Sequence, residues 1–156
     1  MSRIYNEYDA FLIDLWGVMH NGIKLYSSAL EVIQKLDENN KKVIFLSNAP
    51  RPNSKVKEFL KKLNMEEKFL KNIFTSGEAA RNSLKEEKFG KKFFHLGPPR
   101  DFDLFRKFEN NKVNNIDESE YILCSGLFEE HENDLEYYKN FLSTQISKKM
   151  ICTNPD

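Results

Sequence analysis

Three short apolar segments of this chain each end in polar residues that could act on a phosphate group. Asp14 follows the segment AFLI and leads into the glycine-containing loop WGVMHNG, Ser47 and Asn48 end KVIFLSN, and Thr75 ends NIFT. A carboxylate can bind a metal ion or attack phosphorus, and hydroxyl and amide groups can donate hydrogen bonds to phosphate oxygens. Each residue also has a structural alternative: Asp14 and Thr75 as caps, Ser47 and Asn48 as turn residues.

The elements that would position these residues alternate between strand and helix. Apolar runs predict strands over 10–14 and 42–48 and a third ending at Phe74, and helical spacing of apolar residues follows each of them. The pattern Ser28-x-x-Glu31 resembles a capping box at the start of the first helix. This alternation is typical of a parallel α/β sheet with right-handed crossovers, in which the polar strand ends meet at one edge.

A charged stretch around one glycine, KEEKFGKK, separates this pattern from the remainder of the chain. Beyond it we expect strands over 92–97 and 121–126 and from residue 150 onward, with a helical segment after each of the first two. The polar segment ENNKVNNIDES is expected to be a surface loop. We therefore predict two domains, 1–86 and 87–156.

Bulk composition excludes several classes of function. The chain has 24 basic and 24 acidic residues, so it lacks the excess positive charge of nucleic-acid-binding proteins. Its apolar runs are far shorter than the ~20 residues that span a bilayer, and its first residues do not resemble a signal peptide. Cys124 and Cys152 lie far apart in the sequence and are expected to be reduced, buried thiols. We expect a cytoplasmic protein without nucleic-acid or membrane partners.

The motifs together resemble one family. FLIDLWGVMHNG and VIFLSNAPRP resemble the first and second motifs of the haloacid dehalogenase (HAD) phosphatases, and IFTSGEAA resembles the third strand and helix of the class IIA, NagD-like members. The motif DLWGV resembles that of one bacterial subgroup of the class. The resemblance implies an α/β fold: a HAD-like Rossmannoid parallel sheet, present as a partial core over 1–86, with a partial α/β cap of the C2 type over 87–156.

The resemblance also implies chemistry. Asp14 would be the nucleophile that forms an aspartyl-phosphate, and its carboxylate would hold Mg²⁺ together with the main-chain carbonyl of Trp16. Ser47 would bind the transferring phosphoryl group, with Asn48 beside it. The substrate would be a small phosphorylated metabolite.

Two further residues match the family's cap. FHLGPPRD, CSGLFEE and ICTNPD resemble pieces of the cap domain. Within the last of these, Asn154 and Asp156 match the loop that helps to choose the substrate.

The chain departs from the family's pattern in two ways. The second Asp of the family's first motif, which acts as a general acid and base, is Trp16 here, and an indole N–H cannot replace it. His20 is either a substitute acid or a surface loop residue. The family's third and fourth motifs, a Lys and the acids that complete the Mg²⁺ site, follow the cap and are not found in residues 1–156. We expect a fragment or a truncated gene product, with an exposed apolar edge on the strand that ends at Asp14.

Two functional hypotheses remain open. The chain is part of a Mg²⁺-dependent phosphomonoester phosphatase that is inactive alone and is completed by a complementary C-terminal fragment, encoded separately or within a longer parent chain. Alternatively, it is a non-catalytic remnant or a phosphate-binding module, which Trp16 favours. A receiver-like signalling domain is a weaker third hypothesis, because the chain has no acidic pair near its start.

Overall fold

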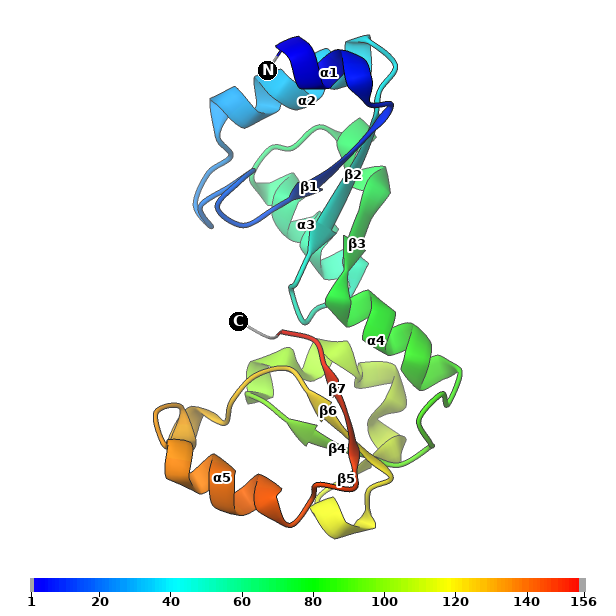
Figure 1. The fold of residues 1–156 in the computed structure, drawn as a ribbon, viewed down its shortest axis with the longest axis vertical. Helices are drawn as coiled ribbons and strands as arrows, with labels where there is room; N and C mark the ends of the chain where they lie inside the picture. The colour runs from blue at the N-terminus through cyan, green and yellow to red at the C-terminus, as the bar shows by residue number, and fades with distance from the viewer. Residues whose placement is uncertain (1, 155–156) are drawn as a thin grey trace. The chain divides into compact units, whose positions relative to one another are not determined.

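The computed structural model describes residues 2–154, which form two compact units (Figure 1). Unit 1 consists of the described residues up to Ser47 together with Asn53–Thr75. Unit 2 consists of Asn48–Pro52 and the described residues from Ser76 onward.

Unit 1 is a three-stranded parallel sheet with its helices. Its elements are α1 (Ser2–Glu7), β1 (Ala10–Asp14), α2 (Ser27–Glu38), β2 (Lys42–Ser47), α3 (Asn53–Lys62), the 3-10 helix η1 (Glu67–Asn72) and β3 (Ile73–Thr75). The strand order is β1-β2-β3, with Asp14 aligned to Leu46 and Ser47 aligned to Thr75. Within the described residues β1 is therefore an edge strand.

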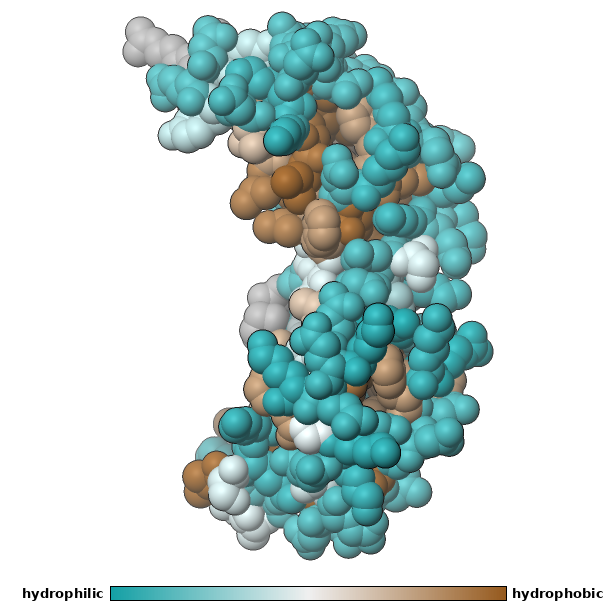
Figure 2. Space-filling view, turned by 90° about the vertical axis from the view of Figure 1, so that its right-hand side faces the viewer, coloured by the Kyte–Doolittle hydropathy of each residue, from teal (hydrophilic) through white to brown (hydrophobic). Residues whose placement is uncertain are grey.

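The two faces of this sheet differ in burial. The face that carries Val43, Phe45 and Ile73 is buried, and α2 and α3 contribute buried Ile33, Leu36, Val56 and Leu60 to the same core. Residues of the other face are open: Leu12 is 66% exposed, Leu46 43% and Phe74 54%. Apolar surface of unit 1 is visible in Figure 2. Parallel sheets are normally covered on both faces, so the described residues of unit 1 leave one face without its usual covering layer.

Unit 2 contains a four-stranded parallel sheet of order β5-β4-β6-β7. Its elements are α4 (Ser76–Lys85), β4 (Phe93–Leu96), η2 (Pro99–Leu104), η3 (Arg106–Asn111), β5 (Lys112–Val113), η4 (Ile116–Glu118), β6 (Tyr121–Cys124), η5 (Glu129–His131), α5 (Leu135–Ser143) and β7 (Lys149–Cys152). Every residue of β6 is buried, as expected for a central strand covered on both sides.

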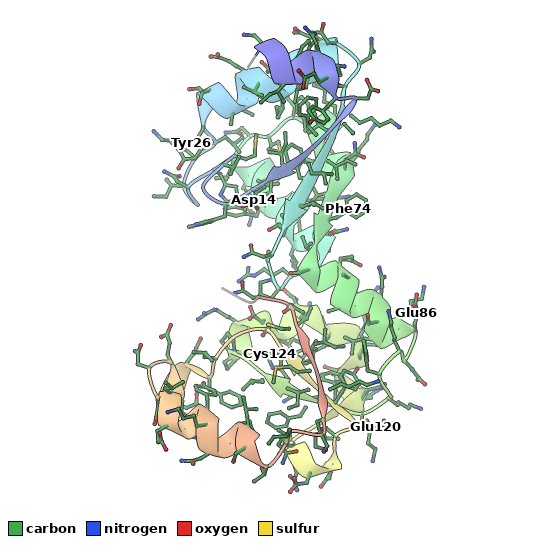
Figure 3. All side chains as sticks on the ribbon, in the orientation of Figure 1. Asp14, Tyr26, Phe74, Glu86, Glu120 and Cys124 are labelled. Carbon is green, nitrogen blue, oxygen red and sulfur yellow. The ribbon has the colours of Figure 1, made fainter. Side chains whose placement is uncertain are left out.

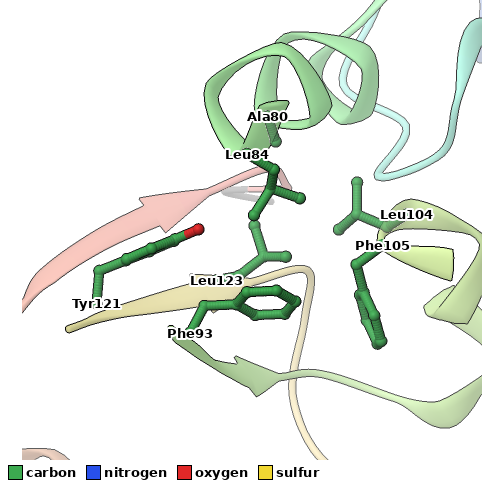
Figure 4. Close-up of a cluster of buried hydrophobic side chains, with 7 residues drawn as sticks. All are labelled: Ala80, Leu84, Phe93, Leu104, Phe105, Tyr121 and Leu123. Atoms are coloured by element: carbon green, nitrogen blue, oxygen red, sulfur yellow. The ribbon is translucent and has the colours of Figure 1, made fainter. Parts of the chain in front are cut away.

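Two apolar clusters cover the two faces of the unit 2 sheet. The cluster shown in Figure 4 joins α4 and η2 to β4 and β6 through seven buried side chains: Ala80, Leu84, Phe93, Leu104, Phe105, Tyr121 and Leu123. The second cluster joins α5 to the opposite face through Tyr138, Leu96, Ile122 and Cys124. Unit 2 thus has the two covering layers that unit 1 does not.

The structure confirms the predicted parallel α/β class and corrects local details. The capping box at Ser28 is wrong: α2 begins at Ser27, so Ser28 lies inside the helix, and the N-cap position is Tyr26, which makes no side-chain capping bond. The polar segment expected to be a loop contains β5, which pairs with β4. Apart from the segment 48–52, which belongs to unit 2, the units divide at 75/76, whereas the predicted domains divide at 86/87. The difference is α4, whose Ala80 and Leu84 pack into the core of unit 2.

Gly77 allows α4 to approach the segment 48–52 closely. Its backbone N–H donates to the carbonyl of Ala49 at 3.1 Å. A Cβ atom at Gly77 would lie 2.3 Å from the backbone nitrogen of Arg51 and 2.5 Å from its carbonyl oxygen. These are backbone atoms, so a rotamer change cannot relieve the clash.

We expect Gly77→Ala to destabilise the protein. Alanine improves helix propensity by at most ~1 kcal/mol, whereas overpacking against backbone costs roughly 1–3 kcal/mol or more. Thermal unfolding followed by circular dichroism should give a lower Tm, by several degrees. Asn82→Ala, at an exposed position of the same helix, is the matched control and should leave Tm within about 2 °C. An unchanged Tm for Gly77→Ala would contradict the close approach.

Candidate active site

Asp14 and Ser47 lie at the carboxyl ends of neighbouring parallel strands in unit 1. Figure 3 labels Asp14 at the end of β1, and Ser47 ends β2 one register position beyond Leu46, the partner of Asp14. The Asp14 side chain is exposed, and its Oδ1 accepts a hydrogen bond of 2.7 Å from the backbone N–H of Leu15. Ligands of open α/β sheets bind at this edge, so the two residues stand where a phosphate could be held.

The loop after Asp14 is tightly structured. Leu15 and Met19 are each 1% exposed and anchor it in the unit 1 core. The Met19 N–H donates to the Leu15 carbonyl at 2.8 Å, and the Gly17 N–H donates to the His20 carbonyl at 2.9 Å. Gly17 has φ of +73°, a left-handed conformation that costs glycine little. The loop therefore holds a fixed shape beside Asp14.

The indole of Trp16 folds back on this loop. Its ring meets the His20 ring edge-on at 5.6 Å between centroids. A Cβ atom at Gly22 would lie 2.9 Å from Trp16 Cζ3, and Gly22 also has a positive φ of +87°. Trp16 is nevertheless 64% exposed. An apolar ring thus occupies the position where the resembled family has an acid.

His20 is buried, at 5% exposure, so its interpretation as a surface loop residue is wrong. Its Nδ1 accepts a hydrogen bond of 3.0 Å from the Gly22 N–H, which places the ring proton of the neutral imidazole on Nε2. Burial lowers the pKa of His20, and the negative charge of Asp14 opposes that shift. A neutral imidazole with one nitrogen already bound is a poor proton donor near neutral pH.

The remaining predicted site residues belong to unit 2. Asn48 lies in the segment 48–52, and its Nδ2 is 3.5 Å from Oδ1 of Asn154, at the outer limit for a hydrogen bond. The structure thus places Asp14 and Ser47 at neighbouring strand ends of unit 1, and Asn48 beside Asn154 in unit 2. Asp156 lies outside the described residues.

Unit 2 contains a crevice that sequence reasoning did not predict. It has a volume of about 550 Å³ and lies at the carboxyl ends of β4, β6 and β7. The chain leaves β4 toward η2 and leaves β6 toward α5, which cover opposite faces of the sheet. Ligands of α/β sheets bind where successive connections diverge in this way. Residues that line the crevice include Arg51, Arg100, Asp101, Ser125, Cys152 and Asn154.

A buried polar group lies beside the crevice. Nε2 of His95 is 2.9 Å from Oγ of Ser125, and the Ser125 hydroxyl donates to the carboxylate of Asp101. Because that hydroxyl has one proton, His95 must donate its Nε2–H to Ser125. A Cβ atom at Gly97 would lie 2.2 Å from Ser125 Oγ, so only glycine fits there. Ser125 is held as donor and acceptor at once, unlike a serine activated by histidine.

Comparison with known proteins decides the family. The sequence profile of the haloacid dehalogenase-like hydrolases matches residues 11–110, which include Asp14, Ser47 and the loop between β1 and α2. The chain belongs to this family. The predicted family is thereby confirmed, and NagD-like members are among the solved structures that share its fold. No curated protein matches the chain.

Several solved structures of the family are similar to this chain. A haloacid dehalogenase-like hydrolase from Brucella suis 1330 has 27% identity and a TM-score of 0.83, covering 99% of this chain and 59% of its own. A p-nitrophenyl phosphatase from Archaeoglobus fulgidus has 25% identity and a TM-score of 0.70, covering 96% and 56%. A glycerol phosphate phosphatase from Mycobacterium tuberculosis, solved with magnesium, has 20% identity and a TM-score of 0.64, covering 98% and 46%.

This haloacid dehalogenase-like chain thus spans less than two thirds of the length of these structures. Within the described residues, none of the helices is both long and apolar enough to cross a membrane.

The His95 group predicts a pH dependence of stability. Burial lowers the pKa of His95 to about 4, with the positive charge of Lys112 adding to the shift. The unfolded chain therefore binds a proton near pH 6.5 that the folded chain binds only near pH 4. Stability should fall as pH falls through that window, by about 2 kcal/mol between pH 7 and pH 5.

Urea midpoints at pH 7 and pH 5 measure this fall, and His95→Gln should reduce it. Asp101, whose pKa is raised by burial, contributes with the opposite sign, but it is present in both proteins. His131→Gln, at a partly exposed position, is the matched control and should keep the wild-type difference. An equal loss of stability in wild type and His95→Gln would contradict the assignment.

Proposed function

We propose that this chain is the Asp14-bearing portion of a Mg²⁺-dependent phosphomonoester phosphatase acting on a small phosphorylated metabolite. The observation that carries the proposal is the position of Asp14 and Ser47 at adjacent strand ends in a chain of the haloacid dehalogenase-like family. A carboxylate oxygen of Asp14 attacks phosphorus, the bond to the leaving oxygen breaks, and an aspartyl-phosphate forms. Ser47 donates a hydrogen bond to the transferring phosphoryl group.

The donors present suit magnesium in type. Mg²⁺ prefers oxygen ligands, keeps several waters, and commonly binds through one or two carboxylates and a substrate phosphate. Asp14 and the Trp16 carbonyl would hold the ion, which would neutralise charge on the phosphate. The described residues contain no cluster of three or more His, Cys, Asp or Glu that could hold a metal. We infer that the affinity of this chain alone is low, and that further ligands come from another polypeptide segment.

The exposed face of the unit 1 sheet supports the inference that another polypeptide segment binds next to Asp14. Asp14 projects from the same face of β1 as Leu12, because alternate residues of a strand share a face. Exposed Leu46 and Phe74 extend that face across β2 and β3. On the other face of the sheet, an apolar groove of about 690 Å³ lies between β1 and α2, is lined in part by Ile4, Phe11 and Val18, and adds further uncovered surface along this edge strand. A partner that covers these surfaces would place its own polar groups next to Asp14.

We therefore propose a complementary C-terminal fragment as the partner of this chain. The fragment would supply the missing helical layer, a strand beside β1, and the Lys and acidic groups that phosphoryl transfer requires. Substrate selection is assigned to unit 2, where Asn154 lines the crevice; Asp156 is proposed to act with it.

The first test is complementation. The purified chain is mixed with the part of the Brucella suis relative that lies beyond the aligned 59%, and phosphate release from p-nitrophenyl phosphate is measured with Mg²⁺. We expect activity from the mixture, little from either part alone, and loss of at least a hundredfold with Asp14→Asn.

Binding is measured separately by calorimetry, and Asp14→Asn should still bind the fragment. Binding without phosphate release would favour the alternative of a non-catalytic, phosphate-binding remnant. Turnover by the isolated chain that Asp14→Asn abolishes would refute both the remnant and the need for a partner.

The second prediction concerns the leaving group. Among residues 14–25, only Asp14, His20 and Lys24 can titrate, and none is placed as the general acid. We expect complemented enzyme to favour substrates with stable leaving anions, such as p-nitrophenyl or acyl phosphates, over alkyl phosphates.

Trp16→Asp should raise turnover of glycerol phosphate by roughly 10²–10⁴-fold and that of p-nitrophenyl phosphate far less, because general acid help matters most for poor leaving groups. Trp16→Asn, which has the size but not the proton, is the matched control. Equal effects of the two variants on both substrates would show that Trp16 acts only through packing.

A further inference from the structure

Unit 2 carries two cysteines side by side in its sheet. Cys124 ends β6 and Cys152 ends β7, and the two are register partners in a parallel pair. Register partners project to the same face of a sheet, and both residues line the crevice at the strand ends. Figure 3 labels Cys124 at this position. Both are free thiols, but Cys152 is exposed, so the prediction that both are buried is wrong for Cys152.

The two thiols differ in access to solvent. Cys152 is exposed, whereas Cys124 is 9% exposed and its thiol donates to the carbonyl of Gly126 at 3.6 Å. Burial raises the pKa of the Cys124 thiol to about 11, and the neighbouring Cys152 thiol adds to the shift. A reagent in solution would therefore meet Cys152 first, with Cys124 directly behind it.

The backbone holds this pair in place. Both the N–H and the hydroxyl of Thr153 donate to the carbonyl of Cys124, at 2.9 and 3.0 Å. Thr153 is 1% exposed. The carboxyl end of β7 is thus fastened to β6 immediately after Cys152, so the two sulfurs remain neighbours even though β7 is an edge strand.

The spacing is close to that of a disulfide. Neighbouring strands lie ~4.8 Å apart, within the ~4.4–6.8 Å range of Cα separations in disulfides, whose Cβ atoms lie ~3.8 Å apart. Cβ atoms of residues directly opposite each other on neighbouring strands lie ~4.5–5.5 Å apart, so closing the bond requires an approach of roughly 1 Å at the Cβ atoms. An edge strand can make that movement, because only one of its sides is bonded to the sheet.

We propose that Cys152 and Cys124 form an oxidative modification site, in which low-molecular-weight disulfides convert the pair into an intramolecular disulfide. The Cys152 thiolate attacks one sulfur of the reagent RSSR, forming a mixed disulfide and expelling RS⁻, which takes up a proton. Cys124 then loses its proton to solvent and attacks the Cys152 sulfur, expelling the second RS⁻. The protein gives up two electrons and two protons, and RSSR becomes two RSH.

The bond would change the crevice. Both sulfurs stand on its wall, and the bond would draw them together at the mouth beside Asn154. The disulfide would also join β7 covalently to the central strand. We therefore expect the oxidised protein to unfold at a higher urea concentration than the reduced protein.

Oxidised glutathione serves as the probe in the test. The reduced chain is incubated with it, unreacted thiols are alkylated, and intact masses and peptide maps are recorded. We expect wild type to become two hydrogens lighter with both cysteines protected from alkylation. Cys124→Ser should stop at a single glutathione adduct on Cys152, and Cys152→Ser should react at least tenfold more slowly. Circular dichroism checks the fold of each variant, and Cys124→Ala replaces Cys124→Ser if that variant unfolds.

Three outcomes would overturn the proposal. In the first, the wild-type protein remains reduced. In the second, its reaction stops at the glutathione adduct, and in the third it forms disulfides only between chains. The first would show that Cys152 is not reactive, the second that Cys124 cannot reach it, and the third that the pair is not held for closure within one unit. None of these outcomes depends on phosphatase activity.

Discussion

A parallel β-sheet has to bury both faces and satisfy the hydrogen bonds of its edge strands, and this requirement shapes everything else in the molecule. Its strands are apolar on both sides, so each uncovered face exposes large side chains to water. Unit 2 meets the requirement, with α4 and η2 on one face and α5 on the other. Unit 1 has only one covered face, and Leu12, Leu46 and Phe74 remain exposed on the other.

The same geometry decides where chemistry can occur. In a parallel sheet the carboxyl ends of all strands lie at the same edge, so polar residues that end neighbouring strands gather there. In unit 1 these are Asp14 and Ser47, and in unit 2 they are the groups around Ser125 and Cys152. Asp14, the candidate nucleophile, lies on the uncovered face of the sheet, in the edge strand β1. Completing the sheet and completing the site are therefore one structural event in the proposed enzyme.

The sequence alone predicted those structural features that depend on short, local patterns of apolar and polar residues. The strands that end at Asp14 and Ser47 follow from short apolar runs, and the parallel arrangement follows from their alternation with helical spacing. The burial of His20 could not be read in this way, because a polar residue in a glycine-containing loop is usually exposed. Its burial results from contact with Phe59, a residue of α3 far along the chain.

The unit 2 crevice was missed for a related reason. Ser125 and Asp101 each follow or lie near the end of a strand, where polar residues usually form turns. Their pairing with His95 depends on Gly97, whose missing side chain lets three separate segments meet. A glycine after a strand predicts a turn from sequence alone. Only the assembled sheet shows that the absence of a side chain at Gly97 leaves space for the hydroxyl of Ser125. Resemblance singled out Asn154, which lines this crevice, whereas it did not point to the groups around it.

Trp16 shows how a scaffold can persist while one chemical group is absent. The loop after Asp14 is fixed by Leu15, Met19 and backbone hydrogen bonds, none of which involves the side chain of residue 16. A main-chain carbonyl remains available as a metal ligand whichever residue stands there. In the proposed enzyme, Trp16 in place of an acid would remove proton transfer but would leave the position of Asp14 unchanged. The Trp16 ring packs on Gly22, which has no side chain to collide with it, and on the buried imidazole of His20. In the proposed enzyme, positioning of Asp14 and acid catalysis would therefore be separable properties of this loop.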